Sequence, residues 1–149
     1  MRRRTFIYFF SFLLIAPVAL AEELEQKSSM NEYLWRNRPL LVFAPHEDHS
    51  FLAAQHQAIA GQFAGLRDRD IVVIEVAGDR VIINGRSGGQ LKAAVLRTLY
   101  GFRASDAAVL LVGKDGGVKL QQSSVVSAQV LFDTIDAMPM RQLEMGGLK

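Results

Sequence analysis

The chain has 149 residues, 50% of them hydrophobic, and it contains no cysteine. Without cysteine there are no disulfides, no thiol oxidoreductase or peroxidase chemistry and no thiolate metal sites, so stability must come from core packing. The 17 basic and 15 acidic residues give a formal net charge of +2, and they are interspersed without a basic stripe, so we expect no nucleic-acid partner.

The N-terminal segment is typical of a secretory signal peptide. Arginines at positions 2–4 precede an apolar run, and Ala19-Leu20-Ala21 forms a small-residue cleavage site before polar residues. We therefore predict that residues 1–21 are cleaved, that the protein is periplasmic or secreted, and that it meets the membrane only through the signal peptide. An uncleaved membrane anchor is the alternative. The signal peptide holds three of the 17 basic residues and no acidic one, which leaves a mature net charge of −1.

The mature chain is long enough for one ordinary domain. Residues 22–32 are polar and are predicted to be a mobile segment, and Tyr33-Leu34-Trp35 is a lead-in that buries an aromatic ring. Residues 38–44 are apolar on both faces, as expected for a central strand. A polar cluster follows Pro45. The chain then continues into a predicted helix that ends at Gly65, with a stripe formed by Leu52, His56, Ile59 and Phe63. We expect His56 to be a rim or core histidine with a satisfied ring nitrogen.

The middle of the chain predicts an edge hairpin and a second helix. Residues 71–76 form a β-branched strand, Gly78-Asp79 a tight turn and residues 80–83 a short strand, with Asn84-Gly85 as the closing turn. Ser87 and Gln90 have the spacing of a capping box. They precede a helix that ends at Gly101.

The C-terminal third predicts a hairpin and a last helix. A strand over residues 107–112 turns at Asp115-Gly116 into residues 118–121. Ser127 is placed to cap the final helix, which Pro139 ends. The order β-α-β-α-β-β-α indicates an α/β fold with a mixed central sheet, helices on both faces and an extra edge hairpin near residues 71–84. This is the thioredoxin topology, predicted over residues 33–141 and followed by a C-terminal tail at 142–149.

Two sequence motifs resemble thioredoxin. The thioredoxin signature Phe-Trp-Ala-Pro-Trp-Cys-Gly-Pro-Cys aligns without a gap with residues 42–50, where its two redox cysteines fall on Glu47 and Ser50. Tyr100-Gly101-Phe102-Arg103 is similar to the Tyr-Gly-Ile-Arg that precedes the thioredoxin cis-proline, and Asp106 stands at about the place of that proline. The resemblance implies a thioredoxin-like scaffold from which the redox chemistry has been removed.

Three longer segments resemble a narrower family. They are Tyr33-x-Trp35-x-x-Arg38-Pro-Leu-Leu-Val-Phe-Ala-Pro45, Gly113-Lys-Asp-Gly-Gly-Val-Lys-Leu120 and Leu131-Phe-Asp-Thr-Ile-Asp-Ala-Met-Pro-Met-Arg141. Together they are similar to the thioredoxin-like "DUDES" domain of unknown function in secreted bacterial proteins, with relatives in vertebrate sushi-repeat matrix proteins. The resemblance implies a fold and a secreted habit, and no established activity.

The residues at the former redox position suggest two functions. The first is a non-catalytic binding or accessory module of the bacterial cell envelope, without a cofactor and with an envelope protein as partner. Its recognition surface, which we name the corner, comprises residues 46–50 and the facing loop 103–106. The corner residues with candidate binding roles are His46, Glu47, Asp48, His49, Ser50, Arg103 and Asp106.

The alternative function is metal binding, or a metal-dependent enzyme, in which His46, Glu47, Asp48 and His49 hold a divalent metal. The positive end of the helix dipole opposes a cation there, although two carboxylates outweigh that partial charge. A third interpretation assigns no function: the acidic residues satisfy free amides at a helix start.

Overall fold

The computed structural model describes residues 20–21, 24 and 30–147. Most of the predicted signal peptide and most of the segment 22–29 lie outside the described residues. Within the part that is described, no helix is both long enough and apolar enough to cross a bilayer.

The described elements from residue 30 onward alternate between helices and strands. In chain order they are η1 (Asn31–Tyr33), β1 (Arg38–Ala44), α2 (Ser50–Ile59), α3 (Phe63–Asp68), β2 (Ile71–Ala77), β3 (Arg80–Ile83), β4 (Arg86–Ser87), α4 (Ala93–Tyr100), β5 (Ala108–Val112), β6 (Val118–Gln122), α5 (Ala128–Asp136) and α6 (Pro139–Gly146). The six strands form one sheet in the order β4-β3-β2-β1-β5-β6. Strands β1 and β2 are parallel and the other neighbours are antiparallel. This is an α/β thioredoxin-like fold with an additional edge hairpin, as the sequence predicts.

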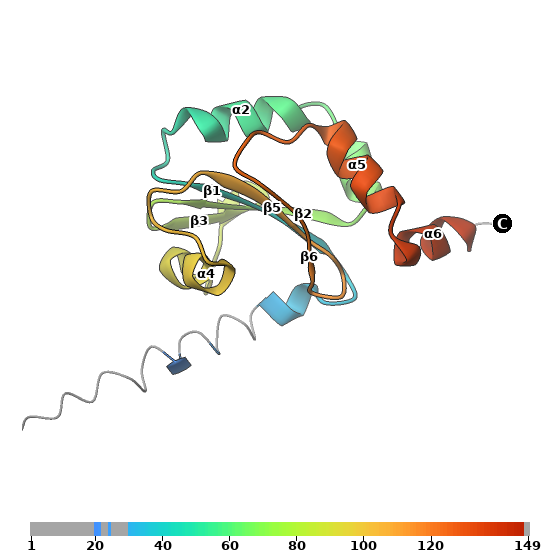
Figure 1. Cartoon of the computed structure of the whole chain (residues 1–149), viewed down its shortest axis with the longest axis horizontal. Coiled ribbons are helices and arrows are strands. Elements are labelled where there is room, and N and C mark those ends of the chain that lie inside the picture. Colours follow the sequence, from blue (N-terminus) through green and yellow to red (C-terminus); the bar gives the residue numbers. More distant parts are fainter. Residues whose placement is uncertain (1–19, 22–23, 25–29, 148–149) are drawn as a thin grey trace, which may run out of the picture.

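Strand β1 is the centre of the molecule. All seven of its residues are buried, and they alternate between two cores because successive side chains of a strand point to opposite faces. Leu41 and Phe43 pack towards α4, whereas Leu40 packs with residues of α2, α3 and α5. Figure 1 shows α2 and α5 on one side of the sheet and α4 on the other. The parallel pairing ends with Ala44 opposite Ala77, so the loops after β1 and β2 leave the same edge of the sheet.

The helix after β1 is shorter than predicted. It ends at Ile59, and Gly61, with φ of +75°, separates it from the short helix α3. Gly65 does not end a helix but lies within α3, where an added Cβ would be 2.6 Å from the Phe132 ring, so α5 can pack only against a glycine. The break changes the helical phase and leaves Phe63 76% exposed instead of on the buried stripe.

The predicted capping box before α4 is wrong. Ser87 belongs to β4 and pairs with Ile82, and the ladder continues through the N–H of Gly88, which donates to Val81 O at 2.8 Å. Helix α4 begins only at Ala93, without a side-chain cap. Its end agrees with the prediction, since Gly101 adopts the left-handed conformation at φ +74°.

The last predicted helix is two helices in the structure. Ser127 caps α5 as predicted, and its hydroxyl accepts from the N–H of Val130 at 3.3 Å. Pro139 does not simply stop this helix but occupies the first turn of α6, a position where its missing N–H costs nothing. Residues 142–146, predicted to be part of a tail, are therefore helical.

The lead-in before β1 buries one aromatic ring and exposes the other. Tyr33 is 9% exposed, whereas Trp35 is 68% exposed. Trp35 has a φ of +62°, and its N–H donates to Lys114 O at 2.7 Å. A left-handed backbone is uncommon for a bulky residue, and here the contact to the β5–β6 turn holds it.

Candidate functional site

The first loop of the corner is a tight turn that leads into α2. The N–H of His49 donates to His46 O at 3.2 Å, and the two imidazole rings lie 5.2 Å apart in an edge arrangement. His49 Nδ1 accepts from the N–H of Phe51 at 3.3 Å and caps the helix. The sequence placed a helix start here correctly, but the capping group is an imidazole and not one of the two acids.

The acidic residues of this loop point to solvent or to another strand. Glu47 forms an exposed ion pair with Arg80 at the start of β3, and Asp48 and Ser50 are exposed. Among the described residues there is no group of three or more His, Cys, Asp or Glu side chains placed to hold a metal ion. His46, Glu47, Asp48 and His49 are thus neighbours in one turn, but the structure does not bring all four together around one point.

The second loop of the corner is closed by its own ion pair. The Asp106 carboxylate accepts from the N–H of Arg103 at 2.8 Å and from Arg103 Nε at 3.3 Å. The backbone hydrogen bond from Arg103, followed by its guanidinium, lowers the pKa of Asp106 below its ordinary value. The two residues therefore stabilise the shape of the loop, with the Arg103 side chain 85% exposed.

Arg97 on α4 connects the ends of β1 and β2 to the second loop. It is only 5% exposed, and its Nη2 donates to Ala44 O at 2.5 Å and to Val76 O at 3.1 Å, at the ends of β1 and β2. Its Nη1 donates to Arg103 O at 3.1 Å in the second loop. Burial lowers the pKa of Arg97, while the charges of Asp106 and Asp79 oppose that shift.

Arg97 is not among the site residues predicted from the sequence. Its signal was a position four residues after Ala93, on the face of α4 that carries Leu96 towards the core. The guanidinium of an arginine on the inner face of a helix is shielded from water. Its N–H groups therefore need acceptors within the protein, and backbone carbonyls are the acceptors available at strand ends.

A hollow of about 440 Å³ lies where these parts meet. Its walls come from the residue before the first loop, the β2–β3 turn, α4 and the second loop with the residue before it; they include Pro45, Gly78, Asp79, Arg97, Phe102 and Ala104. Gly78 has a φ of +55°, and an added Cβ there would lie 3.6 Å from Pro45 O. The hollow thus borders the second loop directly through Ala104, whereas the first loop meets it only through the preceding Pro45 and none of residues 46–50 lines it. No direct contact joins the 46–50 side chains to Arg103 or Asp106 among the interactions of the described residues.

Comparison with known proteins places the chain in a family. Residues 29–144 match the family described as "Domain of unknown function (DUF4174)". The chain belongs to this family. A similar relative is "Coiled-coil domain-containing protein 80" of Danio rerio, 28% identical over 133 residues that cover 78% of this chain and 15% of the relative. The chain therefore spans about 15% of the length of that curated relative.

The DUF4174 domain has a charged cluster at the opposite end of β1. Four cations and four anions pair there, and they come from β1, the end of α3, the α3–β2 connection, the β5–β6 turn, α5 and α6. They are Arg38, Arg69, Lys114 and Arg141 with Asp68, Asp70, Asp136 and Glu144. The Glu144 carboxylate accepts from Arg38 Nη2 at 3.1 Å and from Lys114 Nζ at 2.7 Å. Each of the three longer segments that carry the family resemblance places one cation here, namely Arg38, Lys114 and Arg141. The residues that these segments share with the family therefore contribute to the structure of this end of β1.

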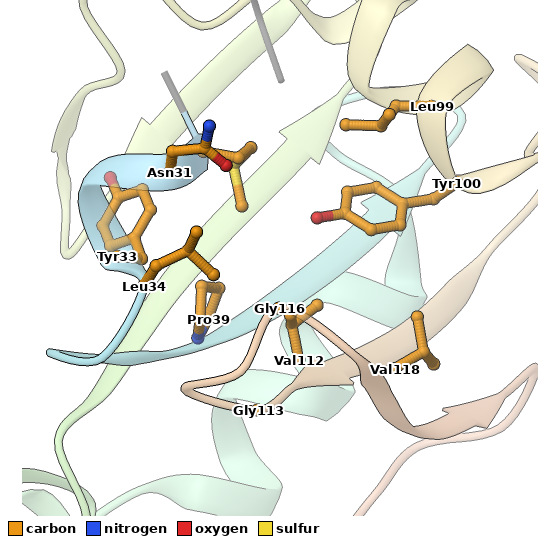
Figure 2. A pocket seen from close by; sticks show the side chains of 11 residues that line it. Asn31, Tyr33, Leu34, Pro39, Leu99, Tyr100, Val112, Gly113, Gly116 and Val118 are labelled. Carbon is orange, nitrogen blue, oxygen red and sulfur yellow. The ribbon is translucent and has the colours of Figure 1, made fainter. Parts of the chain in front are cut away.

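A smaller cavity of about 260 Å³ lies between η1, α4 and the β5–β6 turn. Figure 2 shows the Tyr100 hydroxyl directed into it from the end of α4, with Tyr33, Leu34 and Pro39 across the gap. Burial raises the pKa of Tyr100, and burial together with the neighbouring Glu32 raises the pKa of Tyr33 to about 12. Both hydroxyls are therefore neutral at physiological pH, and neither tyrosine brings a charge to this mostly apolar cavity.

Proposed function

We propose that the DUF4174 domain is a non-redox, thioredoxin-like binding or accessory domain of the bacterial cell envelope, which recognises a protein partner with the corner. The observation that supports this most is the hollow beside Arg97, which lies between Pro45, just before the first loop of the corner, and Ala104 in the second loop. The chain has the thioredoxin-like architecture and the loops of the corner but no cysteine, so this site has no thiol for redox chemistry.

The contacts within the corner favour binding over catalysis. Glu47 is paired with Arg80, Asp106 with Arg103, and His49 Nδ1 accepts from the N–H of Phe51 instead of from the Ser50 hydroxyl. Ser50 therefore lacks the positioned base that activates a hydroxyl nucleophile. The same contacts hold both loops in a fixed shape before any partner arrives, which lowers the ordering cost of association.

The compartment and the finer family are part of this proposal. Support for a periplasmic or secreted location comes from the signal-like residues 1–21. The three quoted segments support membership of the thioredoxin-like DUDES group. An experimental structure of the matched segment of the Danio rerio relative tests that point: the same strand order β2-β1-β5-β6 is expected, and a different order would contradict it.

A site-specific cross-linking experiment tests the binding function. A photo-crosslinking amino acid replaces the exposed Ala104, which lines the hollow, and in a separate control it replaces the exposed Gln121 on the edge strand β6. We expect adducts with an envelope protein from position 104 and not from position 121. Substituting Glu47→Ala, Asp48→Ala and His49→Asn together should abolish the adduct, because asparagine retains a helix cap while the recognition groups are lost. Adducts that persist in this variant, or that form equally from both positions, would refute the proposal.

A further inference from the structure

A second large hollow is a groove on the α2 face of the sheet, away from the corner. It has a volume of about 760 Å³ and lies between the α2–α3 region, β2 and the turn at Asn84 and Gly85. Its floor follows β2 from Ile71 to Glu75, a length of roughly 13 Å at the rise of a strand. A volume of this size falls within the range of small-molecule sites in proteins.

The groove has an apolar trough within a partly polar lining. Ile59 and Leu66 approach from α2 and α3, and Ile71 and Val73 rise from β2. Phe63 also lines the groove and is 76% exposed, although it is one of the largest apolar side chains of the domain. An exposed phenylalanine at the mouth of an apolar groove is a feature of binding sites, since it leaves apolar area in water until a ligand covers it.

Most polar groups of the groove already have protein partners. His56 Nε2 lies 2.9 Å from Glu75 Oε1, which agrees with the prediction of a rim histidine with a satisfied nitrogen. The Asp70 carboxylate binds Lys114 Nζ at 2.7 Å. Asn84 Oδ1 accepts from the N–H of Val73 at 3.0 Å and so extends the β2 ladder.

Arg67 is the exception. It lines the groove from the last turn of α3 and is exposed, and no ion pair or side-chain hydrogen bond is formed by it within the described residues. The two acids of the groove, Asp70 and Glu75, face Lys114 and His56, so Arg67 is the one charged side chain of the lining without a partner among the described residues. A guanidinium binds a carboxylate in a planar, two-bond geometry.

We propose that this groove binds a small amphipathic carboxylic acid, with the apolar body over Ile71 and Val73 beside Phe63 and the carboxylate on Arg67. The assignment follows from charge complementarity and from the volume of the groove, and it does not depend on the function of the corner. A neutral or cationic molecule of the same length gains the apolar contacts but not the ion pair.

Decanoate is a suitable probe, and amide chemical shifts of the mature domain report where it binds. We expect saturable binding below 1 mM with shift changes concentrated at residues 59–73 and 84–85, whereas decyltrimethylammonium binds at least about tenfold more weakly. Arg67→Gln should reduce the affinity for decanoate about tenfold, and Arg36→Gln, at an exposed arginine outside the groove, should not change it. Ala60→Trp fills the groove from its rim and should abolish binding while the rest of the spectrum stays folded.

Three results would overturn the assignment. The first is the absence of saturable binding, and the second is equal affinity of the wild type and Arg67→Gln for decanoate. The third is broadening of the groove signals with protein concentration in the absence of probe, together with a doubled mass in light scattering, which would identify a second copy of the chain as the occupant.

Discussion

The two ends of β1 are built in opposite ways. At its N-terminal end Arg38 is 1% exposed, and the charged cluster pairs four cations with four anions across six parts of the chain. At its C-terminal end a single buried cation, Arg97, donates only to backbone carbonyls, and the ion pairs of the corner lie at the surface. The ion pairs of the cluster hold α6 and the neighbouring turns together. At the corner, in contrast, there is a hollow, and polar side chains face solvent. We infer that the first end stabilises the domain and that the second recognises a partner.

The largest effect is expected at the single buried cation of the corner end. Arg97→Met removes three charge-assisted hydrogen bonds, although Ala44 O and Arg103 O keep the N–H groups of Gly78 and Asp106 as donors. Hydrogen bonds to charged groups contribute about 1.5–3 kcal/mol each. We expect the free energy of unfolding in urea to fall by about 3 kcal/mol. The matched control Arg36→Met, at an exposed arginine, should change it by less than about 0.5 kcal/mol. Equal effects of both substitutions would show that Arg97 does not hold the loops.

The next effect is expected in the charged cluster. Glu144→Gln keeps the shape of the side chain but removes the charge that faces Arg38 and Lys114. Because Arg38 is almost fully buried, its charge is then incompletely compensated, and we expect a loss of about 2 kcal/mol in the free energy of unfolding. A loss below about 0.5 kcal/mol would contradict the structural role of this end.

Acid should weaken the domain through the same cluster. Hydrogen bonds from Arg69, and then Arg141, lower the pKa of Asp136. Burial alone would raise the pKa of Glu144, but its bonds to Lys114 and Arg38 lower it below the ordinary value. The unfolded chain therefore binds protons more readily, so these carboxylates stabilise the fold at neutral pH and lose that contribution as the pH falls through and below their ordinary pKa values near 4. Urea midpoints between pH 7 and pH 3 should fall more steeply for the wild type than for Glu144→Gln, and parallel curves would argue against the assignment.

The smallest effect is expected at the exposed pair of the corner. Glu47→Gln removes a surface ion pair with Arg80 whose two side chains are 47% and 63% exposed. Such pairs contribute roughly 0–1 kcal/mol, so the free energy of unfolding should change by less than about 0.5 kcal/mol. Glu47→Gln is the counterpart of Glu144→Gln at the other end of β1. A similar loss in the free energy of unfolding for the two substitutions would remove the contrast between the two ends.

Local sequence signals predicted much of the fold. The apolar run 38–44, the Ser127 cap and the Gly101 stop each depend on a few adjacent residues, and all three agree with the structure. The errors arose where contacts between separate elements accompany the outcome. Gly65 lies inside a helix, packed against Phe132 far along the chain, and Ser87 joins a strand that pairs with Ile82 of the preceding strand.

The candidate site shows the same division. The turn at residues 46–50 was visible in the sequence, because a strand, a proline and a polar cluster before a helix have one common arrangement. The partners of its side chains could not be predicted, because they depend on the geometry of the turn. Glu47 pairs with Arg80, and His49 accepts from the N–H of Phe51. Arg97 reaches its three carbonyls across the sheet edge, which no local pattern reports.

The most direct test of the division between the two ends is made on the corner variant that carries Glu47→Ala, Asp48→Ala and His49→Asn. Its cross-linking yield from position 104 is measured beside its free energy of unfolding. We predict a yield reduced to background with the free energy of unfolding within about 1 kcal/mol of the wild type, since only exposed groups and a replaceable cap are changed. An undiminished yield, or a yield that falls only because the variant unfolds, would contradict the assignment of recognition to the corner.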